Sequence, residues 1–152
     1  MAKLSSQVAT FMAMVKQDLP TKPTIPADNI VRLRLRLVLE EAFELVESCC
    51  VDDKYNTMYL SNLRADVFET IDRMKVTVDL PEYADAIADI MYVAEGAYLA
   101  AGINGDPIAD EVQRSNLAKL GGDIDANGKA RKPAGWTPPD IRGELVKQGW
   151  SP

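Results

Sequence analysis

The sequence predicts an all-α fold, a helical bundle within a single domain that spans residues 1–152. Apolar residues recur at spacings of three and four in several segments, and prolines, glycines and helix-capping residues separate those segments. The chain is 47% hydrophobic and 26% charged, which is ordinary for a globular protein with a buried core. We expect the bundle to cover residues 5–121 and a loop-rich tail, residues 122–152, to wrap it.

The first helix is predicted over residues 5–18, where one apolar stripe follows helical spacing. The stripe consists of Val8, Phe11, Met12 and Val15. Ser5 or Ser6 is the expected cap. Three prolines follow and forbid a regular helix, so the next segment is predicted to be an extended connector. These prolines are Pro20, Pro23 and Pro26.

A second, long helix is predicted over residues 29–50, with Asp28 or Asn29 as its cap. The run "VRLRLRLVL" alternates strictly from Val31 to Leu37, which is typical of a half-buried strand. We favour the helix because no turn residue separates this run from "EEAFELVES", and Arg, Leu, Glu and Ala all favour helix. The strand stays open as the alternative.

Three further helical segments follow. One is predicted over residues 58–75, and one over residues 81–101 with Asp79 as cap and Gly102 as its end. The next lies within residues 103–122, with Asp106 as cap, Pro107 in the first turn, and Gly121 and Gly122 at its stop. The tail is expected to be irregular apart from a short helical turn from Pro139.

Composition excludes several classes of function. A net charge of -6 has the wrong sign for broad binding to nucleic-acid phosphates, so no nucleic-acid partner is expected. Histidine is absent, which removes Ser/His and Cys/His catalysis and the commonest zinc ligand. No apolar run approaches the ~20 residues of a membrane span, and the adjacent Cys49 and Cys50 offer no loop-spanning disulfide. We therefore expect a cytoplasmic protein without a membrane partner.

Carboxylates concentrate in two of the predicted helices. The stretch "LEEAFELVES", residues 39–48, holds Glu40, Glu41, Glu44 and Glu47, although like charges at helical spacing repel each other. The stretch "EYADAIADIMYV" places Glu82, Asp85 and Asp89 at spacings of three and four. Facing helices with such patches would offer oxygen ligands to Mg²⁺ or Mn²⁺. Solvated acidic faces are the alternative interpretation.

Four segments together resemble the MazG-like all-α NTP pyrophosphohydrolase superfamily, which includes dimeric dUTPases and phosphoribosyl-ATP pyrophosphohydrolases. They are "EEAFE", "ADAIADIMYV", "EVQRSNLAKL" and "NGKARKPAGWTPPDI", and the resemblance runs from about residue 29 to residue 142. It is closest to the MazG-like branch with dUTPase activity. The resemblance implies a homodimer or homotetramer that binds Mg²⁺ or Mn²⁺ through EExxE and ExxD helices. It also implies hydrolysis of nucleoside triphosphates to monophosphate and pyrophosphate, as house-cleaning of the nucleotide pool.

The resemblance carries over to individual acidic residues. Glu40, Glu41 and Glu44 match EExxE, but Ala86 stands where ExxD requires a glutamate three residues before Asp89. We favour Asp85 with Asp89 as the second ligand pair, and the literal pair Glu82 and Asp85 is the alternative. The expected metal ligands are Glu41, Glu44, Asp85 and Asp89. Glu40 and Glu41 are the expected catalytic residues, Glu40 as the group that orients or deprotonates the attacking water.

The resemblance also implies substrate-binding residues near the chain's end. Asn116 and Lys119 would face the nucleotide, and Lys129 and Lys132 would approach its phosphates; solvated lysines are the alternative. Trp136 would either close over a base or anchor the tail. Three other functions stay open: a nucleotide or metal sensor without turnover, an enzyme like phosphoribosyl-ATP pyrophosphohydrolase, and a structural helical oligomer.

Overall fold

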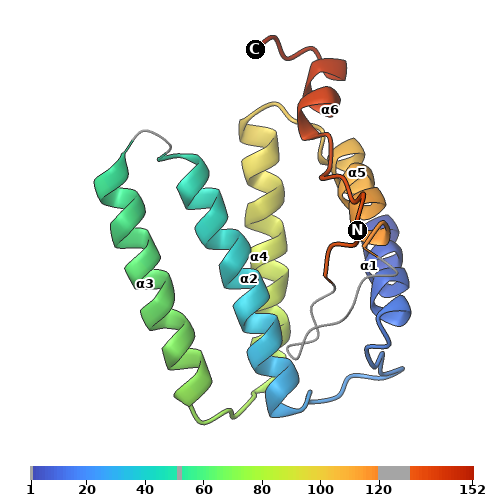
Figure 1. Ribbon diagram of the computed structural model, residues 1–152. Helices are drawn as coiled ribbons and strands as arrows, with labels where there is room; N and C mark the ends of the chain where they lie inside the picture. The colour runs from blue at the N-terminus through green and yellow to red at the C-terminus, as the bar shows by residue number, and fades with distance from the viewer. Residues whose placement is uncertain (1, 51–52, 120–130) are drawn as a thin grey trace. The chain divides into compact units, whose positions relative to one another are not determined.

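The computed structural model describes residues 2–50, 53–119 and 131–152, and within these ranges the regular secondary structure is α-helix alone (Figure 1). The helices are α1 (Ala2–Met14), α2 (Asp28–Ser48), α3 (Lys54–Arg73), α4 (Leu80–Ala100), α5 (Gly105–Leu117) and α6 (Ile141–Lys147). The all-α prediction is confirmed. The chain forms two compact units, the hairpin unit Thr24–Leu80 and the terminal unit Met1–Pro23 with Pro81–Pro152.

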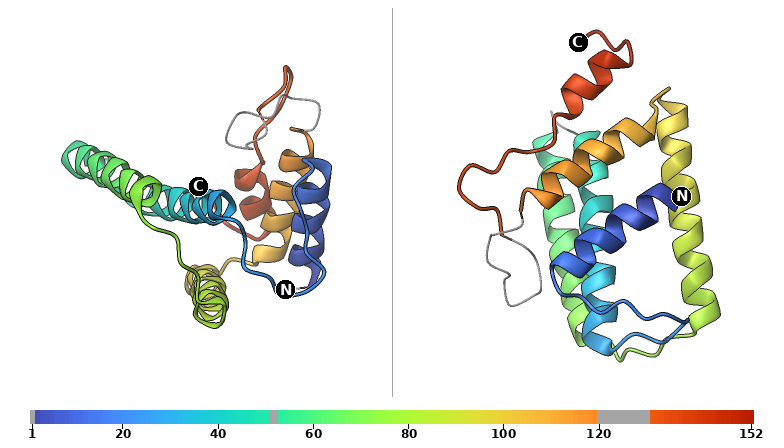
Figure 2. Two further views of the ribbon diagram at one scale, coloured as in Figure 1. Left: turned by 90° about the horizontal axis from the view of Figure 1, so that it is seen from below. Right: turned by 90° about the vertical axis from the view of Figure 1, so that its right-hand side faces the viewer.

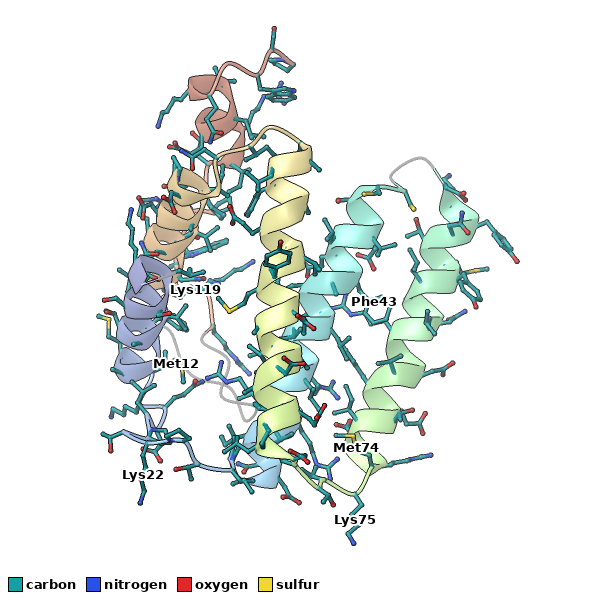
Figure 3. The ribbon with its side chains drawn as sticks, turned by 180° about the vertical axis from the view of Figure 1, so that it is seen from behind. Met12, Lys22, Phe43, Met74, Lys75 and Lys119 are labelled. Carbon is teal, nitrogen blue, oxygen red and sulfur yellow. The ribbon has the colours of Figure 1, made fainter. Side chains whose placement is uncertain are left out.

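In the hairpin unit, α2 and α3 pack side by side (Figures 1 and 2). Val31 of α2 and Ile71 of α3 are buried. Phe43 of α2 meets Phe68 of α3 edge to face, with the ring centroids 6.4 Å apart. Figure 3 shows Phe43 between the two helices. Such an aromatic pair adds about 0.5–1.5 kcal/mol to the burial of the rings themselves. The hairpin therefore holds the glutamate-rich helix α2 against α3.

Arginines explain the strand-like alternation in α2. Arg32 donates to the backbone carbonyl of Ile71 and, at 2.7 Å, to that of Met74, so it serves carbonyls at the end of α3 that lack helical partners. Arg36 donates to both carboxylate oxygens of Asp72 at 2.9 Å. The run is helical, as predicted, and the arginines alternate with leucines because two of them reach across to α3.

Three predicted caps are wrong. Ser5 and Ser6, the expected caps of the first helix, lie inside α1, which begins at Ala2. The N-cap of α2 is Ala27, and Asp28 is the first helical residue, where its negative charge still favours the helix N-terminus. The N-cap of α5 is Asn104, whose side chain accepts from the backbone N–H of Asp106 at 3.2 Å. The predicted caps of α2 and α5 stand one or two residues late. At α2 the cap is an alanine without a side-chain capping bond, so a search for capping residue types passes over it, and at α5 two such types, Asn104 and Asp106, stand close together.

Other helix boundaries also differ from the predictions. α3 begins at Lys54, four residues before the predicted start, because Asp53 caps it by accepting from the N–H of Asn56. α1 ends at Met14, short of the predicted residue 18. α5 ends at Leu117, with Ala118 as C-cap, whereas the predicted stop at Gly121 and Gly122 lies outside the described residues.

In the terminal unit, α1 and α6 both pack on α5 (Figure 2). Asp110 of α5 accepts from Lys3 at 2.6 Å and from Gln7 at 2.7 Å, while Gln113 donates to the backbone carbonyl of Gln7 at 3.0 Å. Val15, Ile108 and Ser115 are buried in this unit. Helix α5 is thus the element against which the first helix, α1, and the last helix, α6, both pack.

Helix α4 ends as the sequence predicts. Gly102 adopts a φ of 69°, the left-handed conformation that favours glycine, and Ile103 N–H bonds back to the Tyr98 carbonyl at 2.9 Å. No residue of α4 is buried. Within the described part of the chain, no single helix has the length and apolar character to cross a membrane; α4 and α5 meet these criteria only as a pair bent by 115°.

Candidate functional site

The EExxE residues of α2 differ in their surroundings. Glu40 is half-buried and forms an ion pair with Arg64 of α3, at 3.1 Å between Oε1 and Nη2, whereas Glu41 and Glu44 are exposed. The guanidinium of Arg64 also lies 5.5 Å from the centroid of the Phe68 ring. Arg64 therefore brings a positive charge to the crowded carboxylates, which relieves part of their mutual repulsion.

Sequence reasoning missed Arg64. The residue lies 24 positions after Glu40, and no helical spacing joins residues on two different helices. Only the register of the α2–α3 hairpin reveals this pairing. In that register Arg36 of α2 also lies 4.5 Å from the centroid of the same Phe68 ring. Arg36 of α2 and Arg64 of α3 both lie over the Phe68 ring, on the side of α3 where Arg64 meets Glu40.

The predicted ligands on α4 are available for binding a cation. Asp85 and Asp89 are exposed, lie four residues apart on an unbroken helix, and therefore point to one side of it. In the described ranges, neither of them nor Glu44 forms a hydrogen bond or an ion pair. Carboxylate oxygens are the ligands that Mg²⁺ and Mn²⁺ prefer, so the donor chemistry fits the expected metal.

The ligand set is not assembled within either unit. Glu41 and Glu44 belong to the hairpin unit, and Asp85 and Asp89 to the terminal unit. Among residues 2–50, 53–119 and 131–152, no three Asp, Glu or Cys side chains are grouped so that they could hold a metal ion. The metal ligands therefore stay predictions that rest on residue type and helical spacing.

Part of the predicted substrate-binding set gathers around Trp136. Lys119, just beyond the C-terminal end of α5, donates to the Asn116 side chain at 2.8 Å (Figure 3). Its ammonium lies 5.7 Å from the centroid of the Trp136 ring, and that of Lys132 lies 4.3 Å from it. Lys129 lies outside the described residues. Three of the four predicted residues are thus brought together.

Trp136 is an anchor for the tail. Its indole N–H donates to the backbone carbonyl of Ser115 at 2.9 Å, and the Ser115 hydroxyl donates to the carbonyl of Thr137 at 3.1 Å. The residue is half-buried. These contacts correspond to the anchoring role that sequence offered beside base stacking. Ser115, which sequence reasoning did not single out, is the partner that makes the anchor.

A second joint links the tail to α5 through Glu111. Its carboxylate accepts from Arg114 at 2.7 Å and from the backbone N–H of Asp140, the N-cap of α6, at 2.8 Å. The Arg114 hydrogen bond, followed by that of Asp140, lowers the pKa of Glu111 from its ordinary 4.5 to about 2. The charged carboxylate therefore fixes the start of α6.

Comparison with known proteins identifies the family. A crystal structure of a proposed NTP pyrophosphohydrolase from Exiguobacterium sp. 255-15 aligns with a TM-score of 0.69 and 24% identity, over 96% of this chain and 95% of that one. This likeness shows the fold. No curated protein matches the sequence. The profile of the phosphoribosyl-ATP pyrophosphohydrolase family matches residues 8–116, a range that includes the acidic motifs of α2 and α4. The chain therefore belongs to the phosphoribosyl-ATP pyrophosphohydrolase family.

Proposed function

We propose that the protein hydrolyses a nucleoside triphosphate to monophosphate and pyrophosphate in a reaction that depends on Mg²⁺ or Mn²⁺. The observation that carries the proposal is the family match across both acidic motifs. Glu44, Asp85 and Asp89 support it, because they are exposed and have no partner among the described residues, and carboxylate oxygens are the ligands that hard cations prefer. We place this activity in the cytoplasm, as house-cleaning of the nucleotide pool.

Each group of side chains has a proposed role. Glu41 and Glu44 on α2, and Asp85 and Asp89 on α4, would hold the metal. A divalent ion held there would supply a water of lowered pKa and polarise phosphoryl oxygens. Glu40, oriented by its 3.1 Å ion pair with Arg64, positions the water that attacks the α-phosphate. Asn116, Lys119 and Lys132 hold the nucleotide and its phosphates.

Two substrates are proposed. The resemblance of the segments "EVQRSNLAKL" and "NGKARKPAGWTPPDI" favours dUTP. The family match favours phosphoribosyl-ATP, in which the same bond between α and β phosphates is cleaved. Both substrates present a triphosphate to the same side chains, so they differ only in the base and sugar contacts.

The test is pyrophosphate release across a panel of NTPs and dNTPs that includes dUTP and phosphoribosyl-ATP, with Mg²⁺ and with Mn²⁺. We expect release with one preferred substrate and its monophosphate as co-product. Glu41→Gln and Glu44→Gln should each lower kcat by at least ~100-fold with an unchanged circular dichroism spectrum. Glu69→Gln is the control, because Glu69 pairs with Arg73 on the exposed side of α3.

Two results would count against the proposal. Full activity of Glu41→Gln would remove Glu41 from the site. If the folded protein binds a nucleotide tightly and cleaves nothing in the panel, the protein is a nucleotide sensor and not a hydrolase. In that case the Ala86→Glu variant, which restores the ExxD spacing to Asp89, should gain turnover.

A further inference from the structure

The segment of residues 131–140, which we call the strap, is bonded along the C-terminal half of α5. Trp136 donates to the Ser115 carbonyl, Ser115 donates to the Thr137 carbonyl, and Arg114 donates to the Pro138 carbonyl at 3.2 Å. Carbonyls in the last turn of a helix lack a helical partner, so the indole of Trp136 satisfies one that would otherwise need water. The strap is thus held by three successive residues of its own.

Ser115 is the centre of this attachment. Its side chain is 2% exposed, which makes it the most buried residue described. A buried hydroxyl is costly unless it is hydrogen-bonded, and the Thr137 carbonyl provides its acceptor at 3.1 Å. The hydroxyl and the carbonyl of one residue therefore fix Trp136 and Thr137 together.

The attachment of the strap determines the position of Lys132 relative to Lys119. Lys132 belongs to the strap and Lys119 follows α5, yet both ammonium groups lie over the ring of Trp136, at 4.3 Å and 5.7 Å from its centroid. Lys132 forms no ion pair with any residue that the structure describes. Two cations drawn to one ring repel each other, and a multiply charged anion between them removes that repulsion.

We infer that Ser115 and Trp136 are positioning residues that set Lys132 beside Lys119, so that the two ammonium groups together bind the pyrophosphate portion of the substrate. The inference rests on the proposed function for the identity of the ligand. Its geometry comes from the strap alone, because loss of either anchor would free Lys132 and leave Lys119 in place beyond the end of α5. Ser115 and Trp136 themselves need not touch the ligand.

Intrinsic fluorescence gives a direct assay, because Trp136 and Trp150 are the two tryptophans of the chain. Trp150→Phe removes the second one, which is 46% exposed and contacts Arg142, and leaves Trp136 as the single reporter. Titration of this variant with inorganic pyrophosphate, without metal or nucleotide, should change the Trp136 emission and saturate. Lys132→Ala should weaken this binding by about tenfold, the effect of one lost charge-assisted hydrogen bond.

A double-mutant cycle separates positioning from general damage. Ser115→Ala should weaken pyrophosphate binding by roughly three- to tenfold when Lys132 is present, and leave it unchanged in the Lys132→Ala background. In turnover, Ser115→Ala should raise KM by the same factor with kcat within about twofold. An equal loss in both backgrounds would overturn the inference, because Ser115 would then act without Lys132.

A second variant tests the same positioning role. If Ser115→Ala fails to fold, Trp136→Phe, which keeps a ring but loses the bond to Ser115, is measured by calorimetry with pyrophosphate; affinity equal to that of the parent would overturn the inference. Trp150→Phe is the matched control and should bind like the wild type. Pyrophosphate binding with intact coupling in a protein that cleaves no nucleotide would refute the proposed function and support the positioning role.

Discussion

Arg64 reduces the repulsion among the carboxylates of α2, because it forms an ion pair with Glu40. Its side chain is 25% exposed and that of Glu40 is 24% exposed, so the pair is shielded more than an ordinary surface ion pair. Arg64→Met should lower the free energy of unfolding by about 1–3 kcal/mol, because it leaves a half-buried carboxylate beside Glu41 and Glu44. Urea unfolding followed by circular dichroism measures the change.

Arg73→Met is the matched control for that prediction. Arg73 pairs with Glu69 one turn away, with the arginine side chain 79% exposed, so its loss should cost less than about 0.5 kcal/mol. Arg64→Lys should recover part of the stability, since it keeps the charge and loses the planar fork. Equal stability of Arg64→Met and Arg73→Met would show that the Glu40 pair contributes nothing special.

At this scale the sequence predicts residue types better than partners. Glu40, Glu41 and Glu44 stand out because their spacing lies within one helix. Arg64 and Ser115 do not, because Arg64 reaches Glu40 across the hairpin and Ser115 meets the strap 21 residues later along the chain. Contacts between elements depend on register, which no local pattern contains.

Among the elements, the joint between α5 and α6 is sensitive to acid. Glu111 keeps its charge in the folded protein down to a pKa of about 2, whereas in the unfolded chain it binds a proton near pH 4.5. Between these values the unfolded state binds more protons, so stability falls as the pH falls. The melting temperature of the wild type should therefore drop from pH 4.5 toward pH 2.

Glu111→Gln isolates this contribution. At neutral pH the variant should melt below the wild type, because a neutral amide keeps at most a hydrogen bond to Arg114 and loses the ion pair, and the two melting temperatures should converge as the pH approaches 2. Differential scanning fluorimetry from pH 6 to pH 2 follows both proteins. Parallel curves over the whole range would mean that Glu111 does not carry the pH dependence.

The elements themselves were largely predictable, and their ends were not. The alternation from Val31 to Leu37 resembles a strand, yet helix propensity without a turn signal identified it correctly. The cap of α5 was misplaced because Asn104 and Asp106 are both good capping residues, and only the backbone conformation distinguishes them. The cap of α2 was misplaced because it is Ala27, a residue type that makes no side-chain capping bond. Gly102 was predicted correctly because a glycine directly after an apolar helical stretch commonly ends the helix in the left-handed conformation.

At the scale of the whole molecule, the unburied helix α4 predicts self-association. Across the described residues, fewer apolar side chains are buried than a chain of 152 residues would need for a stable core, the buried ones being Val15, Val31, Ile71 and Ile108. On α4, Tyr92, Val93 and Leu99 are 80%, 66% and 68% exposed. Exposed apolar surface of this kind is typical of an interface, as in a homodimer or homotetramer.

Leu99→Arg tests that interface away from the acidic motif, because Leu99 lies ten residues beyond Asp89. In a two-fold interface each substitution acts twice, so burial of the two charges should cost at least ~2 kcal/mol and raise the dissociation constant by roughly 30-fold. Sedimentation velocity at micromolar concentration measures it. Met58→Arg is the control, since Met58 is 60% exposed on α3, which already packs on α2. A wild type that sediments as a monomer, or dissociation by Met58→Arg alone, would exclude α4 as the interface.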